Sequence, residues 1–184
     1  MRANDIKLVE VTESDIELIR SWRNSPEVSS YMYSEDKITE EQQKAWFSKV
    51  KDDATSQYWI IEYNGKQLGL ASLTGINKNL NSCYWAFYLG DTSVRGAGIG
   101  GKVEYNVLEY VFETLNLNKL RCEVFTFNDK VIKMHEKFGF RREAFYREHC
   151  FKDDGYKDVV GLALLANEWN VVKEKMHDKV YRRN

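Results

Sequence analysis

A glycine-rich segment followed directly by an amphipathic helix constrains this chain more than any other feature. Residues 95–102 read RGAGIGGK, and Val103, Val107, Val111 and Leu115 then recur every four residues, the spacing of one helix face. Glycines let neighbouring backbone N–H groups converge, and the helix adds unpaired N–H groups and the positive end of its dipole. The segment therefore predicts a cradle for a phosphate-like anion rather than a flexible turn.

Two widespread nucleotide-binding motifs overlap this segment, and neither fits it. Gly96, Gly98 and Gly101 match the dinucleotide fingerprint G-x-G-x-x-G, but that fingerprint needs a strand that runs straight into the first glycine. Here a link intervenes, and no repeated βα units follow. Gly96, Gly101 and Lys102 approach a P-loop, but Val103 stands where Ser or Thr must bind magnesium.

The remaining patterns predict one domain over residues 1–184 with a mixed α/β fold and a mostly antiparallel sheet. Thr12-x-x-Asp15 and Thr39-x-x-Gln42 are patterns typical of helix N-termini, and Asn64-Gly65 is a typical hairpin turn. The predicted order is two helices, three strands, a helix, a strand, a helix and two strands. Helices are expected after Thr12, after Thr39, after the glycine segment and over 128–138, and strands over 58–63, 66–74, 83–89, 119–127, 141–151 and 156–165.

Charge and cysteine content narrow the classes of partner. The formal net charge is −1, which argues against a strongly electrostatic binder of nucleic acid or membranes. Cys83, Cys122 and Cys150 are widely spaced and indicate reduced thiols of a cytoplasmic protein. His135 and His149 share no metal-ligand spacing with them, so we expect no metal. No signal peptide and no apolar run of about 18 residues is evident.

The glycine segment resembles the pyrophosphate loop of the GNAT superfamily of acetyl-CoA-dependent N-acetyltransferases. Arg95, Gly96, Gly98 and Gly100 fit its R-G-x-G-x-G/A pattern, and Asn128 with the later MHEKFGF (134–140) resembles the family's N…(L/M)-Y-E-K-x-G-F helix. The resemblance covers nearly the whole chain. It implies that the strands flanking the cofactor helix splay apart and that the pantetheine arm of acetyl-CoA lies between them. The cofactor contacts expected are Leu89, Arg95, Gly96, Ala97, Gly98, Ile99, Gly100, Gly101 and Asn128, with the backbone N–H near Leu89 as oxyanion donor.

Two titratable side chains are candidates for proton transfer. Glu123 matches a family pocket position, and a carboxylate in this strand would face the cleft as a base while Cys122 and Val124 face the other way. An exposed or ion-paired glutamate is the structural alternative. His135 stands where many members have a tyrosine that protonates the leaving thiolate, and a surface or core histidine is the alternative there.

A second resemblance concerns the acceptor. The segments WRNSP (22–26) and YMYS (31–34) resemble a pattern of the amino-sugar N-acetyltransferases of pseudaminic acid synthesis. That family acetylates a UDP-linked 4-amino-4,6-dideoxy-N-acetyl-altrosamine, whose product feeds the nonulosonic acid used on flagellin. The resemblance and the side-chain chemistry together suggest acceptor contacts at Arg23, Met32, Tyr33, Trp46 and Tyr84.

Two alternatives to the amino sugar stay open from the sequence. Tyr156-x-Asp158 and Glu168-Trp169 also resemble the branch with ribosomal-protein alanine acetyltransferases, so protein N-terminal acetylation is one. A non-catalytic acyl-CoA-binding module is the other, disfavoured by the presence of both Glu123 and His135 beside the loop. Dimers are common in the family, so the resemblance also points to a possible homodimer.

Overall fold

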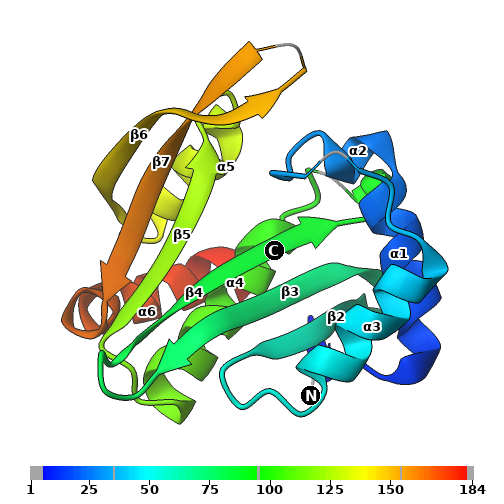
Figure 1. Cartoon of the computed structure of the whole chain (residues 1–184). Helices are drawn as coiled ribbons and strands as arrows, with labels where there is room; N and C mark the ends of the chain where they lie inside the picture. The colour runs from blue at the N-terminus through cyan, green and yellow to red at the C-terminus, as the bar shows by residue number, and fades with distance from the viewer. Residues whose placement is uncertain (1–5, 35, 95, 154, 182–184) are drawn as a thin grey trace.

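The computed structural model describes residues 6–34, 36–94, 96–153 and 155–181. These residues form a seven-stranded sheet in the order β1-β2-β3-β4-β5-β7-β6 (Figure 1). Neighbouring strands are antiparallel except for β4 and β5, which run parallel. The strands are β1 (Lys7–Glu10), β2 (Gln57–Tyr63), β3 (Lys66–Asn77), β4 (Ser82–Leu89), β5 (Lys119–Phe125), β6 (Arg141–Lys152) and β7 (Gly155–Leu165). The predicted mixed, mostly antiparallel α/β fold is confirmed.

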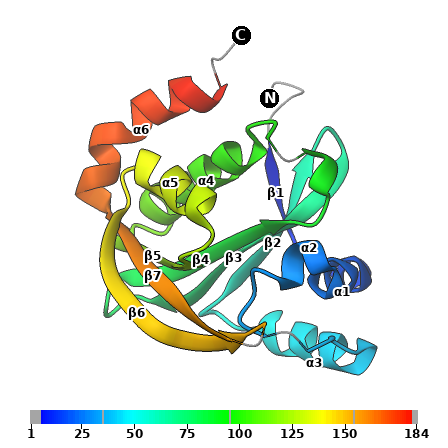
Figure 2. The same cartoon turned by 90° about the horizontal axis from the view of Figure 1, so that it is seen from above.

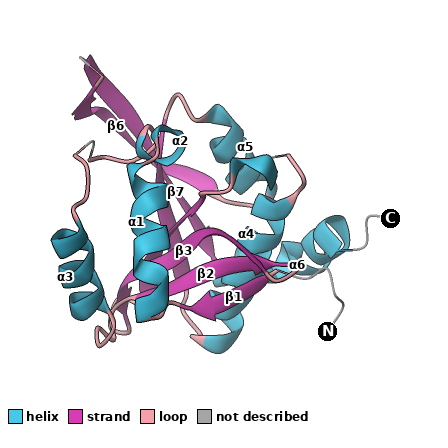
Figure 3. Ribbon diagram, turned by 90° about the vertical axis from the view of Figure 1, so that its right-hand side faces the viewer, coloured by secondary structure: helices cyan, strands magenta, loops and turns pink. Residues whose placement is uncertain are grey.

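Helices cover both faces of this sheet. They are α1 (Ile16–Asn24), α2 (Pro26–Ser29), α3 (Glu40–Val50), α4 (Ile99–Glu109), α5 (Asp129–Lys137) and α6 (Ala166–Tyr181), with short 3₁₀ segments at Glu13–Asp15 and Thr92–Val94. Helices α4, α5 and α6 lie on one face (Figure 2), and α1 and α3 lie on the other (Figure 3). Within the described ranges, no helix is long and apolar enough to cross a membrane.

The parallel pair β4–β5 is the irregular point of the sheet. Its register covers only Ser82 to Tyr84 on β4, paired with Lys119 to Arg121 on β5. Beyond Tyr84, β4 stays paired with β3 as far as Leu89, while β5 stays paired with β7 as far as Phe125. The two strands therefore part toward their carboxyl ends, as Figure 1 shows. We call the point just past Tyr84 and Arg121 the vertex of the splay.

The main core lies between the sheet and α4. Val103, Val107 and Val111 are fully buried, as their spacing predicts, and they belong to one cluster with Leu120 of β5. A smaller cluster of Ile19, Trp22, Ile60 and Leu70 lies under α1 on the opposite face. Alternate residues of β4 and β5 thus face either the α4 side or the α1 side.

Several boundaries differ from those predicted. The order of elements predicted from the sequence omitted β1, α2 and α6. Strand β1 is a four-residue edge strand with little burial. Helix α2 is a single short turn that begins at Pro26, where a proline fits the first helical position. The helix expected to reach Leu115 ends as α4 at Glu109 and continues as one π-helical turn, Tyr110–Thr114. The predicted Asn64-Gly65 turn is present, with φ of 51° and 74° at its two residues.

Candidate active site

The glycine segment forms an open backbone cradle at the start of α4. Gly96 and Gly98 have φ of 87° and 79°, and a Cβ added at either would meet no atom within 4 Å. Gly98 is the N-cap of α4, and the first turn contains no acidic side chain. The N–H groups of Ile99, Gly100 and Gly101 belong to this first turn, where a helix offers no acceptor of its own. The cradle therefore fits the diphosphate of a nucleotide cofactor.

Other residues predicted to contact the cofactor lie in the turn before α4, at the start of α5 and at the end of β4. The N–H of Ala97 donates to the carbonyl oxygen of Val94 at 3.2 Å, so it is already used in the turn. Asn128 is the N-cap residue of α5, and its side chain makes no capping hydrogen bond there. Leu89 is the last residue of β4 and is half-buried. Arg95 lies outside the described residues.

Glu123 lies on the α1 face of β5, just past the vertex. It is exposed, whereas Cys122 and Val124 are buried on the α4 side, so the predicted alternation is present. The hydroxyl of Tyr33 donates to Oε2 of Glu123 at 2.7 Å. Burial and this hydrogen bond raise the pKa of Tyr33 above its usual value, so the phenol remains a donor at neutral pH. Its ring packs edge-on against Phe125 at a centroid distance of 5.3 Å.

His135 lies on the opposite face of the sheet. Its side chain is 3% exposed, and its Nδ1 is 2.8 Å from Oε1 of Glu104, a fully buried residue of α4. Burial alone would lower the pKa of His135, but the carboxylate of Glu104 and the thiol of Cys122 raise it to about 10. The core location agrees with the structural alternative, and proton donation by His135 stays a prediction. Glu104 is not among the site residues predicted from the sequence.

The predicted acceptor residues fall into two groups. Arg23, Met32 and Trp46 line one cavity of about 540 Å³ on the α1 face, against β3 and β4. Tyr33 lies beside Glu123 instead, and Tyr84 lies near the vertex, with the guanidinium of Arg121 4.0 Å from its ring centre.

The wall of this acceptor cavity contains polar groups that sequence analysis did not identify. Gln43 of α3 and Tyr88 of β4 both line it. Their Nε2 and Oη atoms, like Nη1 of Arg23, are buried and have no hydrogen-bond partner among the described residues. Burial lowers the pKa of the Arg23 guanidinium, because the charged form loses hydration there.

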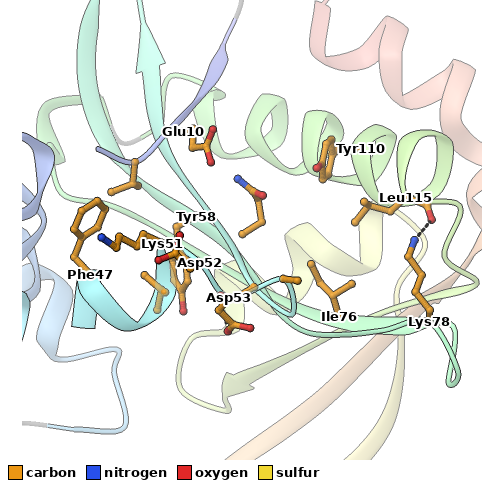
Figure 4. A pocket seen from close by; sticks show the side chains of 15 residues that line it. Glu10, Phe47, Lys51, Asp52, Asp53, Tyr58, Ile76, Lys78, Tyr110 and Leu115 are labelled. Atoms are coloured by element: carbon orange, nitrogen blue, oxygen red, sulfur yellow. Dashed lines mark hydrogen bonds between the residues drawn. The ribbon is translucent and has the colours of Figure 1, made fainter. Parts of the chain in front are cut away.

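A second cavity of about 390 Å³ lies at the other end of the sheet (Figure 4). It is lined by residues at the start of β2 and the end of β3, such as Gln57 and Ile76, and by Leu115 beyond α4. The ammonium of Lys78 donates to the carbonyl oxygen of Leu115 at 2.8 Å along its rim (Figure 4). None of the predicted site residues in the described ranges lines this cavity. In the described ranges, no group of His, Cys, Asp or Glu side chains could hold a metal ion.

A splayed parallel pair, a glycine cradle and titratable groups on both faces together define an acyl-CoA-dependent transferase. A family model described as "Acetyltransferase (GNAT) domain" matches residues 5–141, which include the cradle, Glu123 and His135. The chain therefore belongs to the GNAT acetyltransferases, a family that uses acetyl-CoA, and it is an acetyl-CoA-dependent acyltransferase. The family and the co-substrate predicted from the sequence are confirmed, and the non-catalytic alternative is set aside.

Known relatives differ in the acceptor that their names specify. "Acetyltransferase PseH" of Campylobacter jejuni subsp. jejuni serotype O:23/36 (strain 81-176) is 28% identical over 138 residues, covering 73% of this chain and 84% of the relative. "Spermidine N(1)-acetyltransferase" of Vibrio cholerae serotype O1 is 24% identical over 167 residues, covering 90% and 96%. The crystal structure of spermidine N-acetyltransferase from Vibrio cholerae in complex with CoA and spermine aligns with a TM-score of 0.86 at 23% identity, covering 90% of this chain and 98% of that one. That likeness establishes the fold.

Proposed function

We propose that this enzyme transfers the acetyl group of acetyl-CoA to the 4-amino group of a UDP-linked 4-amino-4,6-dideoxy sugar of the pseudaminic acid pathway. The acceptor amine attacks the thioester directly. The observation that carries this proposal is the chemistry of the acceptor cavity: its described residues include several unpaired hydrogen-bond donors and one carboxylate.

The unpaired donors favour an acceptor rich in oxygen. Nη1 of Arg23 and Nε2 of Gln43 can only donate, and the hydroxyl of Tyr88 can donate or accept. Buried polar groups are normally paired, so these three call for a ligand with several acceptor atoms. The phosphate, sugar and uracil oxygens of a UDP-sugar supply them, and arginine is especially suited to phosphate. Trp46 and Tyr58 add an aromatic wall with a ring-centre distance of 5.0 Å.

The charges of the cavity disfavour a polyamine. Among the residues that the structure describes, two cationic side chains, Arg23 and Lys37, line it, against one carboxylate, Asp36. Spermidine carries several positive charges at neutral pH, and a matching site would need an excess of carboxylates. An acceptor with a negative diphosphate is the better electrostatic complement.

On the other face, the cradle holds the cofactor. The N–H groups of Ile99, Gly100 and Gly101 bind the pyrophosphate oxygens, and the side chain of Asn128 faces a second polar group of the cofactor. Acetyl-CoA supplies the acetyl group as a thioester. The two faces meet at the vertex, which brings amine and thioester together and provides much of the rate acceleration.

Proton transfers are assigned to one group on each face. Glu123, on the acceptor face, removes the proton of the incoming ammonium, directly or through water, while Tyr33 orients its carboxylate. His135, on the cofactor face, donates a proton to the departing thiolate.

The test is a free-thiol release assay with acetyl-CoA and a panel of acceptors: UDP- and dTDP-amino sugars, spermidine, spermine and N-terminal peptides. The expected result is turnover of a UDP-linked 4-amino sugar with a kcat/KM at least tenfold above that of any polyamine or peptide. Preferred turnover of spermidine, or of peptides, would overturn the substrate assignment.

Arg23 provides a second measurement within the same panel. Arg23→Met removes a charged hydrogen bond of about 1.5–3 kcal/mol and should raise the KM for the UDP-sugar about 10- to 100-fold. Arg141→Met is the matched control, because Arg141 pairs with Glu168 at the surface, 76% exposed and outside the cavity lining. If both variants keep the parental KM, the acceptor diphosphate binds elsewhere.

A further inference from the structure

Glu104 of α4 and His135 of α5 form a buried acid–base pair on the cofactor face. Nδ1 of His135 is 2.8 Å from Oε1 of Glu104, and the two side chains are 3% and 0% exposed. The pair lies within the main core: Val107, one helical turn beyond Glu104, belongs to the core cluster, and Phe140 packs against the imidazole at a ring-centre distance of 5.3 Å. A titratable pair enclosed this completely is uncommon in a core.

Core stability does not account for this pair. A buried ion pair is often no more stabilising than well-packed apolar residues of the same volume, because both groups lose their hydration. Oε2 of Glu104 also lacks a hydrogen-bond partner among the described residues, so the carboxylate is only half satisfied. Unexplained buried polar groups of this kind are concentrated at functional sites.

The imidazole lies where the two central strands separate. Its ring packs edge-on against Trp85 of β4 at 5.2 Å, and Cys122 of β5 contributes to the raised pKa of the imidazole. Trp85 and Cys122 are the first residues beyond the last paired positions, Tyr84 and Arg121. His135 therefore spans the vertex from the cofactor face, while Glu123 follows Cys122 on the acceptor face. Glu104 occupies Nδ1, so Nε2 is the nitrogen that can interact with Cys122 in the free protein or with a bound thioester at the vertex.

We propose that Glu104 is a positioning residue for the transfer reaction: it fixes the orientation and proton arrangement of His135, so that Nε2–H faces the vertex and protonates the leaving thiolate. This inference rests on the acid role of His135 in the proposed function. As the amine nitrogen bonds to the carbonyl carbon, it releases its surplus proton to solvent. The carbon–sulfur bond breaks, and the electron pair of that bond stays on sulfur. The Nε2 proton moves to the sulfur. The imidazole is then neutral and keeps its proton on Nδ1, which donates to the carboxylate of Glu104. Solvent then restores the Nε2 proton.

The pair also predicts the direction of a pH effect. The titratable groups that face His135 are Glu104 from α4 and Cys122 from β5, while Trp85 and Phe140 are uncharged. Glu104 raises the pKa of His135, so the imidazolium is present below that pKa and is lost as pH rises through it. Removing the carboxylate lowers this pKa, and the alkaline loss of kcat then begins at a lower pH.

The experiment compares Glu104→Gln with the parent, using the best acceptor of the panel. We expect kcat to fall about 10- to 100-fold with the KM for acetyl-CoA unchanged, and the alkaline limb of kcat to move at least one pH unit lower. In the cofactor-free protein, the ¹⁵N resonances of His135 should titrate at a correspondingly lower pH. Glu104→Asp should recover part of both effects.

Two further variants accompany Glu104→Gln: a control on the same helix and an apolar replacement of Glu104. Glu109→Gln is the matched control on the same helix, because Glu109 accepts a hydrogen bond from the Tyr105 hydroxyl away from His135, and it should leave both profiles unchanged. Glu104→Met, an apolar replacement expected to fold, should reproduce the loss of kcat if Glu104→Gln is unstable.

The outcomes distinguish a failure of the positioning role of Glu104 from a failure of the acid role of His135. If His135→Phe lowers kcat but a folded Glu104→Gln matches the parent in kcat, pH profile and His135 titration, Glu104 has no positioning role. If His135→Phe itself matches the parent, the acid role of His135 fails, and the inference fails with it. If both variants lower only the melting temperature, the pair is structural.

Discussion

Gly98 offers the sharpest test of the cofactor cradle, because its conformation and its surroundings are both defined. At φ of 79°, a valine would have to adopt a backbone conformation that costs about 1–2 kcal/mol for residues other than glycine. No neighbouring atom lies within 4 Å of the added Cβ, so no packing clash adds to this cost. The expected loss of stability is therefore modest, about 2–8 °C in melting temperature for a chain of this size.

Binding of the cofactor should suffer more than the fold. A valine that relaxes toward negative φ turns the adjacent N–H groups away from the point where the pyrophosphate oxygens lie. Hydrogen bonds to charged groups contribute about 1.5–3 kcal/mol each. Loss of a single such bond predicts that the dissociation constant of Gly98→Val for acetyl-CoA, measured by titration calorimetry, is roughly 10- to 100-fold larger than that of the parent.

Gly65 provides the matched control for this substitution. It has φ of 74° in the turn between β2 and β3, and a Cβ there also meets nothing within 4 Å. Gly65→Val should lose the same few degrees of melting temperature and bind acetyl-CoA like the parent. A folded Gly98→Val protein with parental affinity would show that these N–H groups do not hold the pyrophosphate.

Two further variants test the acceptor face. Glu123→Gln should lower kcat by about 10²–10⁴-fold, the usual contribution of a general base. The loss should be largest at low pH, where more of the amine is protonated. A pH–rate profile identical to the parent's would mean that water removes the proton. Tyr84→Ala removes the ring that holds the guanidinium of Arg121 and should raise the acceptor KM about two- to fivefold, since exposed cation–π contacts contribute about 0.5–1 kcal/mol. If only the KM for acetyl-CoA changes, Tyr84 belongs to the cofactor side instead.

Much of the fold follows from local patterns, and its departures have physical reasons. The four-residue spacing from Val103 predicts α4 because a helix repeats every 3.6 residues, and Asn64-Gly65 predicts its turn because both residues accept positive φ. Strand β1 escapes prediction because four largely exposed residues show no periodicity; its existence depends on pairing with β2. The splay itself is a long-range property, set by the different outer partners of β4 and β5, and only the family resemblance indicated it.

The candidate site is predictable where one element determines it and unpredictable where several do. The cradle and the outward direction of Glu123 each follow from a single loop or strand. The acceptor cavity combines α1, α3, β3 and β4, so no single pattern in the sequence selects Gln43 or Tyr88. Glu104 did leave a signal: positions 104, 108, 111 and 115 form a helical stripe that is apolar except for this glutamate. A carboxylate within such a stripe needs a partner from another element, and His135 is that partner.

Glu104 and His135 should depend on each other for the stability of the fold. Many family members have tyrosine at the position of His135, and a neutral phenol needs no carboxylate beside it. His135→Tyr alone should therefore leave Glu104 buried without its cation, and breaking a buried pair in this way costs about 3–5 kcal/mol. Adding Glu104→Leu replaces the stranded carboxylate by an apolar side chain, and the double variant should regain most of that loss in chemical denaturation. If the two substitutions destabilise additively, the groups do not depend on each other, and the pairing seen at Nδ1 has no energetic consequence.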